Sequence, residues 1–140
     1  MCVIEVEQKR NEQSDMREIK FRAKDLLTGE WHYSRDNWLE QLFCPKLYDC
    51  TGEYPGSDKP SIDPSTVGQF TGMVDRNKRE IYEGDILYDH YSNNRFRVYF
   101  TCASFDVEGI LEAEYRSLSD VAIDSEVIGN IHDNPELLKP

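Results

Sequence analysis

The chain has 140 residues, 39% of them hydrophobic and 11% aromatic, and a formal net charge of −11. This apolar content excludes a chain that stays disordered, and the length is short for two domains, so one compact domain is expected. The negative charge repels phosphate backbones and makes nucleic-acid binding by the whole surface unfavourable.

Residues 1–15 begin with a short apolar alternation and then become wholly polar, which predicts an N-terminal extension before a domain at residues 16–140. Residues 19–24 alternate apolar and basic side chains, and this period of two predicts a half-buried strand. A turn at residues 25–30 and a strand at residues 31–34 complete a predicted hairpin. The basic side chains near the first strand are Arg17, Lys20, Arg22 and Lys24. They favour a solvated strand face, with a local nucleic-acid patch as the alternative.

After this hairpin, residues 36–43 are predicted to cap and begin a short helix. Prolines and glycines then predict a loop-rich insertion at about residues 44–66. Further strands are predicted at residues 66–71, 80–82, 86–88, 96–100, 107–115 and 126–131, and a helix start at residues 134–138. Short strands with frequent turns favour a mainly β fold, a small antiparallel barrel or sandwich with one or two short helices.

Three blocks of sequence frame most of the chain. The most distinctive is VGQFTGMVDRNKREIYEGDI at residues 67–86, and the others are MREIKFRA at residues 16–23 and VIGNIHDNPELL at residues 127–138. Together they resemble the YopX-like family of phages and integrated prophages over residues 16–138, with little match in residues 35–65. The resemblance implies a phage or prophage protein, and it brings no assigned biochemical activity.

Glycines and apolar pairs give the central block an architectural interpretation. Gly72 and Gly84 suit corners that need a positive φ, and the second corner resembles the opening strand of SH3-like barrels. The apolar residues for two adjoining strands are Ile81, Tyr82, Ile86 and Leu87. Family members commonly have Asn-Gly in this hairpin, whereas Asn77 is followed by Lys78, so a longer or different turn is expected. Lys24 stands where the family usually has tryptophan, which predicts a more exposed strand edge.

The acidic residues of the central block are Asp75, Glu80, Glu83 and Asp85. A catalytic or divalent-metal site could use such groups, but their spacing follows turns and strand ends, which favours solvated turns with local backbone hydrogen bonds. The histidines are His32, His90 and His132, and the cysteines that could join them at a metal site are Cys44 and Cys50. Nothing in the sequence requires them to converge. We assign no catalytic, cofactor-binding or metal-binding residue and expect no enzyme activity.

The cysteines and the apolar stretches bear on the compartment. The four cysteines form no C-x-x-C pair, so the sequence carries no redox or zinc-ribbon signature. No stretch approaches the roughly 18 apolar residues of a membrane span, and no signal peptide is recognisable. These observations predict a protein of the bacterial cytoplasm with reduced thiols and no membrane association.

The aromatic residues in and beside the loop-rich half are Trp31, Tyr33, Trp38, Tyr48 and Tyr54. Such residues favour core packing, with a subunit or partner interface as the alternative. The leading hypothesis is a non-enzymatic interaction or assembly module that forms a homo-oligomer and binds a phage or host protein. The second is a small nucleic-acid-binding barrel that uses Arg95, Arg97 and Tyr99. A related alternative is that the acidic surface mimics DNA and captures a host DNA-binding protein. The third is an enzyme that uses the carboxylates with Mg²⁺ or Mn²⁺.

Overall fold

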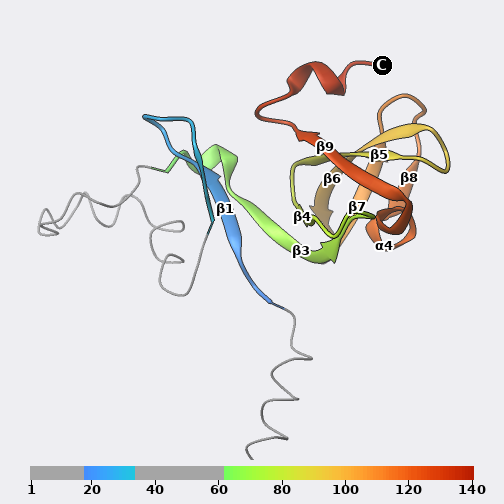
Figure 1. Cartoon of the computed structure of the whole chain (residues 1–140), viewed down its shortest axis with the longest axis horizontal. Helices are drawn as coiled ribbons and strands as arrows, with labels where there is room; N and C mark the ends of the chain where they lie inside the picture. The colour runs from blue at the N-terminus through green and yellow to red at the C-terminus, as the bar shows by residue number, and fades with distance from the viewer. Residues whose placement is uncertain (1–17, 34–61) are drawn as a thin grey trace, which may run out of the picture.

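The structure is a computed structural model that describes residues 18–33 and 62–140 (Figure 1). The predicted extension at residues 1–15, the helix at residues 36–43 and most of the loop-rich insertion lie outside the described residues. Within the described part, antiparallel strands form two sheets, which confirms the mainly β prediction. No helix within residues 18–33 and 62–140 combines the length and the apolar character needed to cross a membrane.

The first sheet has four strands in the order β2-β1-β3-β4. Their bounds are β1 Phe21–Lys24, β2 Trp31–Tyr33, β3 Gly68–Val74 and β4 Glu80–Tyr82. The predicted hairpin at the start of the domain is confirmed, since Ala23 pairs with His32. Strand β1 also pairs with β3 and is therefore internal, so the expectation of an exposed strand edge at Lys24 is wrong.

The second sheet has five strands in the order β8-β7-β6-β5-β9. Their bounds are β5 Asp85–Asp89, β6 Asn94–Thr101, β7 Ser104–Gly109, β8 Tyr115–Ser117 and β9 Ser125–Asn130. The single strand predicted at residues 107–115 is wrong because a loop divides it into β7 and β8. Asn94 organises this loop by accepting hydrogen bonds from the backbone N–H groups of Leu111 and Glu112. A side chain at Gly109 would collide with the carbonyl oxygen of Glu112, so glycine permits the close approach.

Helical structure is limited to short segments in the described part. The helix α4, Leu118–Val121, was not predicted, and it buries Leu118 and Val121. It continues into a 3-10 turn, η2, Ala122–Asp124. The remaining 3-10 turns are η1, Pro64–Thr66, and η3, Pro135–Leu138, the latter at the predicted C-terminal helix start. Segments of three or four residues add little stability of their own, so their apolar side chains matter chiefly as core.

The main hydrophobic core consists of Ile81, Leu87, Phe96, Val98, Val107, Leu118, Val121, Ala122 and Val127. Ile81, Tyr82, Ile86 and Leu87 are all buried, as the central block predicts. Phe96 and Val98 are also buried, whereas Phe100, next in the same alternation, is exposed. Each fully buried side chain of this size contributes about 1.5 to 3 kcal/mol of transfer free energy.

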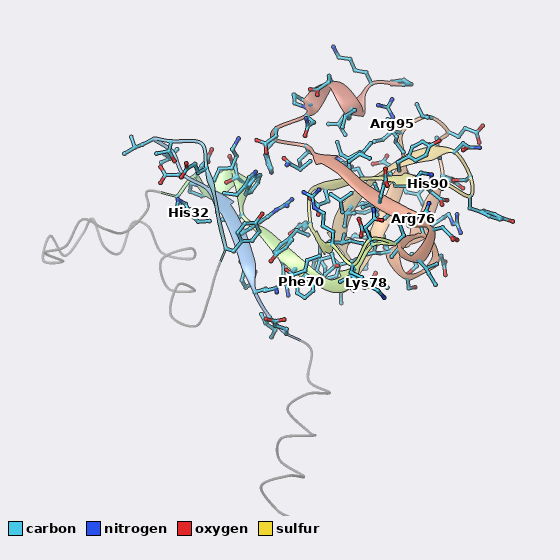
Figure 2. All side chains as sticks on the ribbon, in the orientation of Figure 1. His32, Phe70, Arg76, Lys78, His90 and Arg95 are labelled. Atoms are coloured by element: carbon cyan, nitrogen blue, oxygen red, sulfur yellow. The ribbon has the colours of Figure 1, made fainter. Side chains whose placement is uncertain are left out.

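The turn between β3 and β4 of the first sheet contacts β9 of the second sheet. Lys78 adopts a φ of 67°, and its N–H donates to the carbonyl oxygen of Asp75, so the turn stays tight although lysine replaces the usual glycine. Arg76 lies against β9, where its N–H donates to the carbonyl oxygen of Ser125 at 2.9 Å (Figure 2). The Asp75 carboxylate accepts from the N–H of Val127 at 2.9 Å. The turn therefore covers the outer edge of β9, which protects that edge from pairing with another strand.

Candidate functional site

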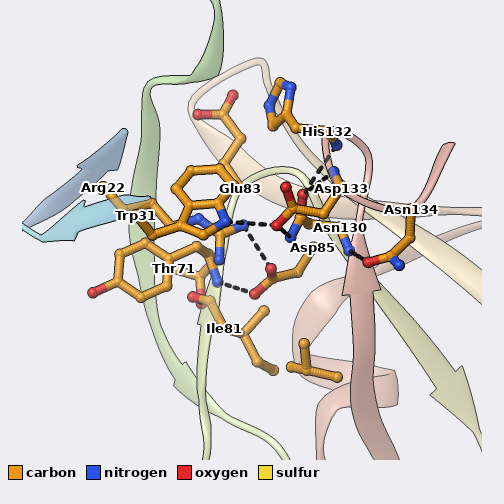
Figure 3. A network of polar contacts seen from close by, with 12 residues as sticks. Arg22, Trp31, Thr71, Ile81, Glu83, Asp85, Asn130, His132, Asp133 and Asn134 are labelled. Atoms are coloured by element: carbon orange, nitrogen blue, oxygen red, sulfur yellow. Dashed lines mark hydrogen bonds and ion pairs between the residues drawn. The ribbon is translucent and has the colours of Figure 1, made fainter. Parts of the chain in front are cut away.

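A buried ion pair joins the two sheets. Arg22 of β1 donates from Nη2 to Oδ1 of Asp85 on β5 at 2.6 Å, and the two side chains are only 5% and 2% exposed (Figure 3). The second carboxylate oxygen of Asp85 accepts from the N–H of Tyr82 at 2.8 Å. Arg22 is thus a buried partner of a carboxylate. Both sequence interpretations of this residue, the solvated strand face and the nucleic-acid patch, are wrong for it.

Aromatic rings and a second carboxylate surround this pair. The Arg22 guanidinium lies 4.5 Å from the centre of the Trp31 ring and 4.9 Å from that of Tyr82. The indole N–H of Trp31 donates to Oδ2 of Asp133 at 2.7 Å, and Lys24 forms an ion pair with the same carboxylate. Trp31 therefore packs between the sheets and is half-buried, whereas Tyr33 is exposed. Trp38, Tyr48 and Tyr54 lie outside the described residues.

The two carboxylates have pKa values shifted in opposite directions. Burial raises the pKa of Asp85 above its usual value, and this effect outweighs the opposing influence of Arg22 and of the Tyr82 N–H. Burial also acts to raise the pKa of Asp133, but hydrogen bonds from Lys24, Trp31 and Asn130 prevail and lower it to about 2. Ionised Asp133 is therefore stabilised by its partners. The desolvation cost of ionised Asp85 is only partly offset.

The four acidic residues of the central block do not converge on one site. Asp75 is buried and accepts hydrogen bonds from the N–H groups of Asn77, Arg79 and Val127, so it caps the turn and ties it to β9. Glu80 pairs with Lys20 at 2.6 Å, and Glu83 lies at the corner between β4 and β5. The expectation of backbone hydrogen bonds is confirmed, but the expectation of solvated turns is wrong for Asp75 and Asp85, because both carboxylates are buried.

The histidines occupy three separate places. His32 contacts Asp25 at 3.1 Å, and His90 contacts Glu126 at 3.6 Å. The ring of His132 lies against that of Trp31, with their centres 5.9 Å apart. Among residues 18–33 and 62–140, no group of three histidine, cysteine or carboxylate side chains is arranged to hold a metal ion. Cys44 and Cys50 lie outside this part of the chain.

A pocket of about 210 Å³ opens where the two sheets meet. Its lining comes from η1 and the residue after it, the corner between β4 and β5, β6 and the turn after β9. The lining residues are Ser65, Val67, Glu83, Gly84, Arg97, Val98, Tyr99, Ile131 and His132. The sequence singled out several of these residues, but it assigned them to different features. Their convergence depends on how the sheets are joined.

The face predicted to bind nucleic acid is already occupied by protein contacts. Arg97 donates to Glu108 at 2.6 Å, and Arg95 donates to the backbone carbonyl oxygen of Lys139 at 2.6 Å. Burial, together with the negative charges of Asp106 and Glu108, raises the pKa of Tyr99. Acidic side chains thus alternate with the two arginines across β6 and β7. Such a surface is poorly suited to phosphate contacts, which require basic groups that are not already paired.

These observations define a small, mainly β protein in which two antiparallel sheets are joined by a buried ion pair. The family model described as YopX protein matches residues 20–139, and the chain therefore belongs to the YopX family. The crystal structure of protein EF1440 from Enterococcus faecalis is similar, with 25% sequence identity and a TM-score of 0.51. The match covers 89% of this chain and 100% of that one. The chain matches no curated protein sequence.

Proposed function

We propose that this YopX-family chain is a non-enzymatic interaction and assembly module of a phage or prophage, and that its copies form a homo-oligomer in the bacterial cytoplasm. The observation that supports this proposal is a group of exposed apolar side chains at one end of the five-stranded sheet. We call this group the apolar end; its members are Tyr91, Leu111, Tyr115 and Ile123.

Hydrogen bonds bring the segments of the apolar end together. Asn94, which follows the β5–β6 turn, accepts from the N–H of Leu111 in the β7–β8 loop at 3.0 Å. His90, at the other end of that turn, donates from its N–H to the carbonyl oxygen of Asp124, the residue after Ile123. Tyr91 therefore lies on a turn that contacts both neighbouring segments. Hydrogen bonds of the backbone and of the Asn94 side chain therefore hold these segments side by side.

Exposure of these side chains is large enough to matter for association. Tyr91 is 83% exposed, Ile123 75% and Tyr115 71%. Single exposed apolar residues are common on protein surfaces, but a group of them on adjoining segments marks an interaction site. Tyrosine is also enriched among residues that dominate interface energetics. Because each copy carries a net charge of −11, self-association through this end should strengthen as salt screens the repulsion.

Size-exclusion chromatography with light scattering at micromolar concentration tests the proposal. We expect an oligomer for the unmodified chain and a monomer for the double variant Tyr91→Ser/Ile123→Ser. Leu27→Ser is the matched control, because Leu27 is 85% exposed but lies in the β1–β2 turn of the other sheet. A purely monomeric unmodified chain at moderate salt would contradict the proposal. Dissociation by the control alone would place the interface elsewhere.

A further inference from the structure

The pocket where the two sheets meet lies away from the apolar end. Its residues on β6, Arg97 to Tyr99, come after Asn94, the residue that organises the apolar end. At about 3.3 Å per residue along a strand, the three to five steps from Asn94 to Arg97 and Tyr99 place this side of the pocket roughly 10 to 16 Å from Asn94. The pocket and the apolar end are formed by different residues, although Tyr115 of the apolar end contacts Glu108, the ion-pair partner of Arg97 in the pocket.

The charges around the pocket leave an excess of negative groups. Arg97 is paired with Glu108, and the neighbouring cations Lys24 and Arg22 are paired with carboxylates described above. Glu83 has no ion-pair partner among the described residues, and it accepts only a long backbone contact of 3.5 Å from Gln69. The carboxylate of Asp63 accepts from Ser65 at 2.7 Å and forms no ion pair in the described part, although hydrogen bonds from Ser65 and the nearby charge of Lys24 lower its pKa.

His132 does not compensate for this excess. Burial, followed by the nearby positive charge of Arg22, lowers the pKa of its imidazole below the usual value, so the ring is neutral at physiological pH. Glu83 and His132 project to the same side, away from the buried Arg22–Asp85 pair (Figure 3). A bound group at this position would therefore meet a carboxylate beside a neutral ring.

The walls of the pocket suit an aliphatic stem. Val67 and Ile131 provide apolar contacts, and Tyr99 adds an aromatic ring, whereas the side chain of Val98 is buried in the main core. Gly84 adds no side chain to the pocket. A first side-chain carbon at this position would lie 3.6 Å from Ile131 and 3.8 Å from the imidazole Nε2 of His132, and would take up part of the pocket. The volume is below the roughly 300 to 1,000 Å³ typical of drug-sized ligands, so one side chain fits better than a cofactor.

We propose that this pocket binds a lysine or arginine side chain of a basic partner polypeptide. The methylene stem packs on the apolar walls and on the ring of Tyr99, which already lies 5.8 Å from the Arg97 guanidinium, and the cationic group pairs with Glu83. The net charge of −11 favours encounter with such a partner and disfavours an anionic ligand. The arrangement corresponds to an interface in which one anchor side chain enters a pocket of its partner.

Amide chemical shifts measured by NMR on the full chain test this inference. The probes are blocked pentapeptides of glycine with lysine, arginine, glutamate or leucine at the centre, together with n-butylamine. We expect saturable shifts at Gly84, Val98 and Ile131 with millimolar affinity for the lysine and arginine peptides. The glutamate and leucine peptides should leave these amides unchanged. The affinity should fall as salt rises, because the contact is an ion pair near the surface.

Two isosteric variants locate the contact. Glu83→Gln should weaken binding of the lysine peptide by about fivefold or more, the effect of losing one partly exposed ion pair. Glu112→Gln removes the same charge in the loop beside Asn94, at the apolar end, and should leave binding unchanged. The same spectra report whether each variant is folded.

Several results would overturn the inference. Equal shifts with the glutamate peptide, or unchanged affinity in Glu83→Gln, would show that the pocket does not select a cation through Glu83. Binding of n-butylamine as tight as that of the lysine peptide would assign the site to a free amine and not to a polypeptide. Self-association is measured separately by light scattering. Loss of peptide binding with the oligomer intact therefore refutes only this inference, and a monomeric chain that binds the peptide refutes only the assembly proposal.

Discussion

The Arg22–Asp85 ion pair provides the sharpest test of how the two sheets are held together. Replacing Asp85 by asparagine keeps an oxygen that can accept the Tyr82 N–H, but it leaves the Arg22 guanidinium buried without a counter-charge. Replacing Arg22 by methionine leaves the Asp85 carboxylate in the same position. Each single change is expected to lower the free energy of unfolding by about 3 to 5 kcal/mol, because an unpaired charge remains in a water-excluded site.

The double variant Arg22→Met/Asp85→Asn is expected to be far less damaging than the sum of the single changes. It removes both charges and keeps the apolar packing of a long side chain under Trp31. Exchange of a whole buried pair for uncharged groups is commonly neutral within about 1 to 2 kcal/mol. In this structure the pair is also incompletely satisfied, since Nε of Arg22 is buried without a hydrogen-bond partner in the described part.

Urea unfolding followed by far-ultraviolet circular dichroism gives the four free energies of this double-mutant cycle. The pH dependence supplies an independent check. The pKa of folded Asp85 lies above the unfolded value of 3.8, so its contribution to stability is fully present below 3.8 and declines as the pH rises through the folded pKa. The Arg22→Met variant should therefore lose more stability at neutral pH than in mild acid. Single changes that add without coupling would refute the reasoning.

Three further perturbations have defined outcomes. Asp75→Ala removes the acceptor for three backbone N–H groups and should cost about 2 to 4 kcal/mol in urea unfolding, whereas an effect below about 1 kcal/mol would contradict its role in fastening the turn to β9. Lys78→Gly should raise the thermal midpoint, since Lys78 holds a φ of 67° at a cost of about 1 kcal/mol, and a lower midpoint would show that its side chain contributes contacts that outweigh this strain. The pKa of Asp133 is lowered to about 2, so stability should be lost as the pH falls from about 4 toward 2, and Asp133→Asn should flatten this part of the stability curve measured by calorimetry.

Local features of the fold were predictable because each depends on a few neighbouring residues. Alternation of apolar side chains located β1 and β6, and the positive φ predicted at Gly72 and Gly84 is confirmed. Gly84 stands at a corner, whereas the corner predicted at Gly72 is wrong, because this residue lies within β3 where the register with β4 shifts. The loop between β7 and β8 was missed because it is set by the side chain of Asn94, which is distant along the chain. Helix α4 was missed for a related reason: a four-residue segment has no periodicity to detect.

The candidate site was less predictable than the fold. Basic residues on an alternating strand are ordinarily solvated, and only the packing of β1 between β2 and β3 places Arg22 against Asp85. The pocket also draws residues from four separate segments of the chain, so no single motif carries its signature. Sequence spacing identified the residue types correctly, but the assignment of each to core, edge or pocket required the long-range contacts between sheets.

The corner between β4 and β5 shows how this separation of roles arises. Gly84 has a φ of 91°, a conformation that glycine adopts without strain, and it stands between two carboxylates with opposite environments. Asp85 faces the interior, where it pairs with Arg22 and holds the sheets together. Glu83 faces the pocket and has no ion-pair partner among the described residues. The Asp85 carboxylate therefore stabilises the fold, whereas the Glu83 carboxylate remains available to a bound cation. Substitution of Asp85 should change stability, and substitution of Glu83 should change binding.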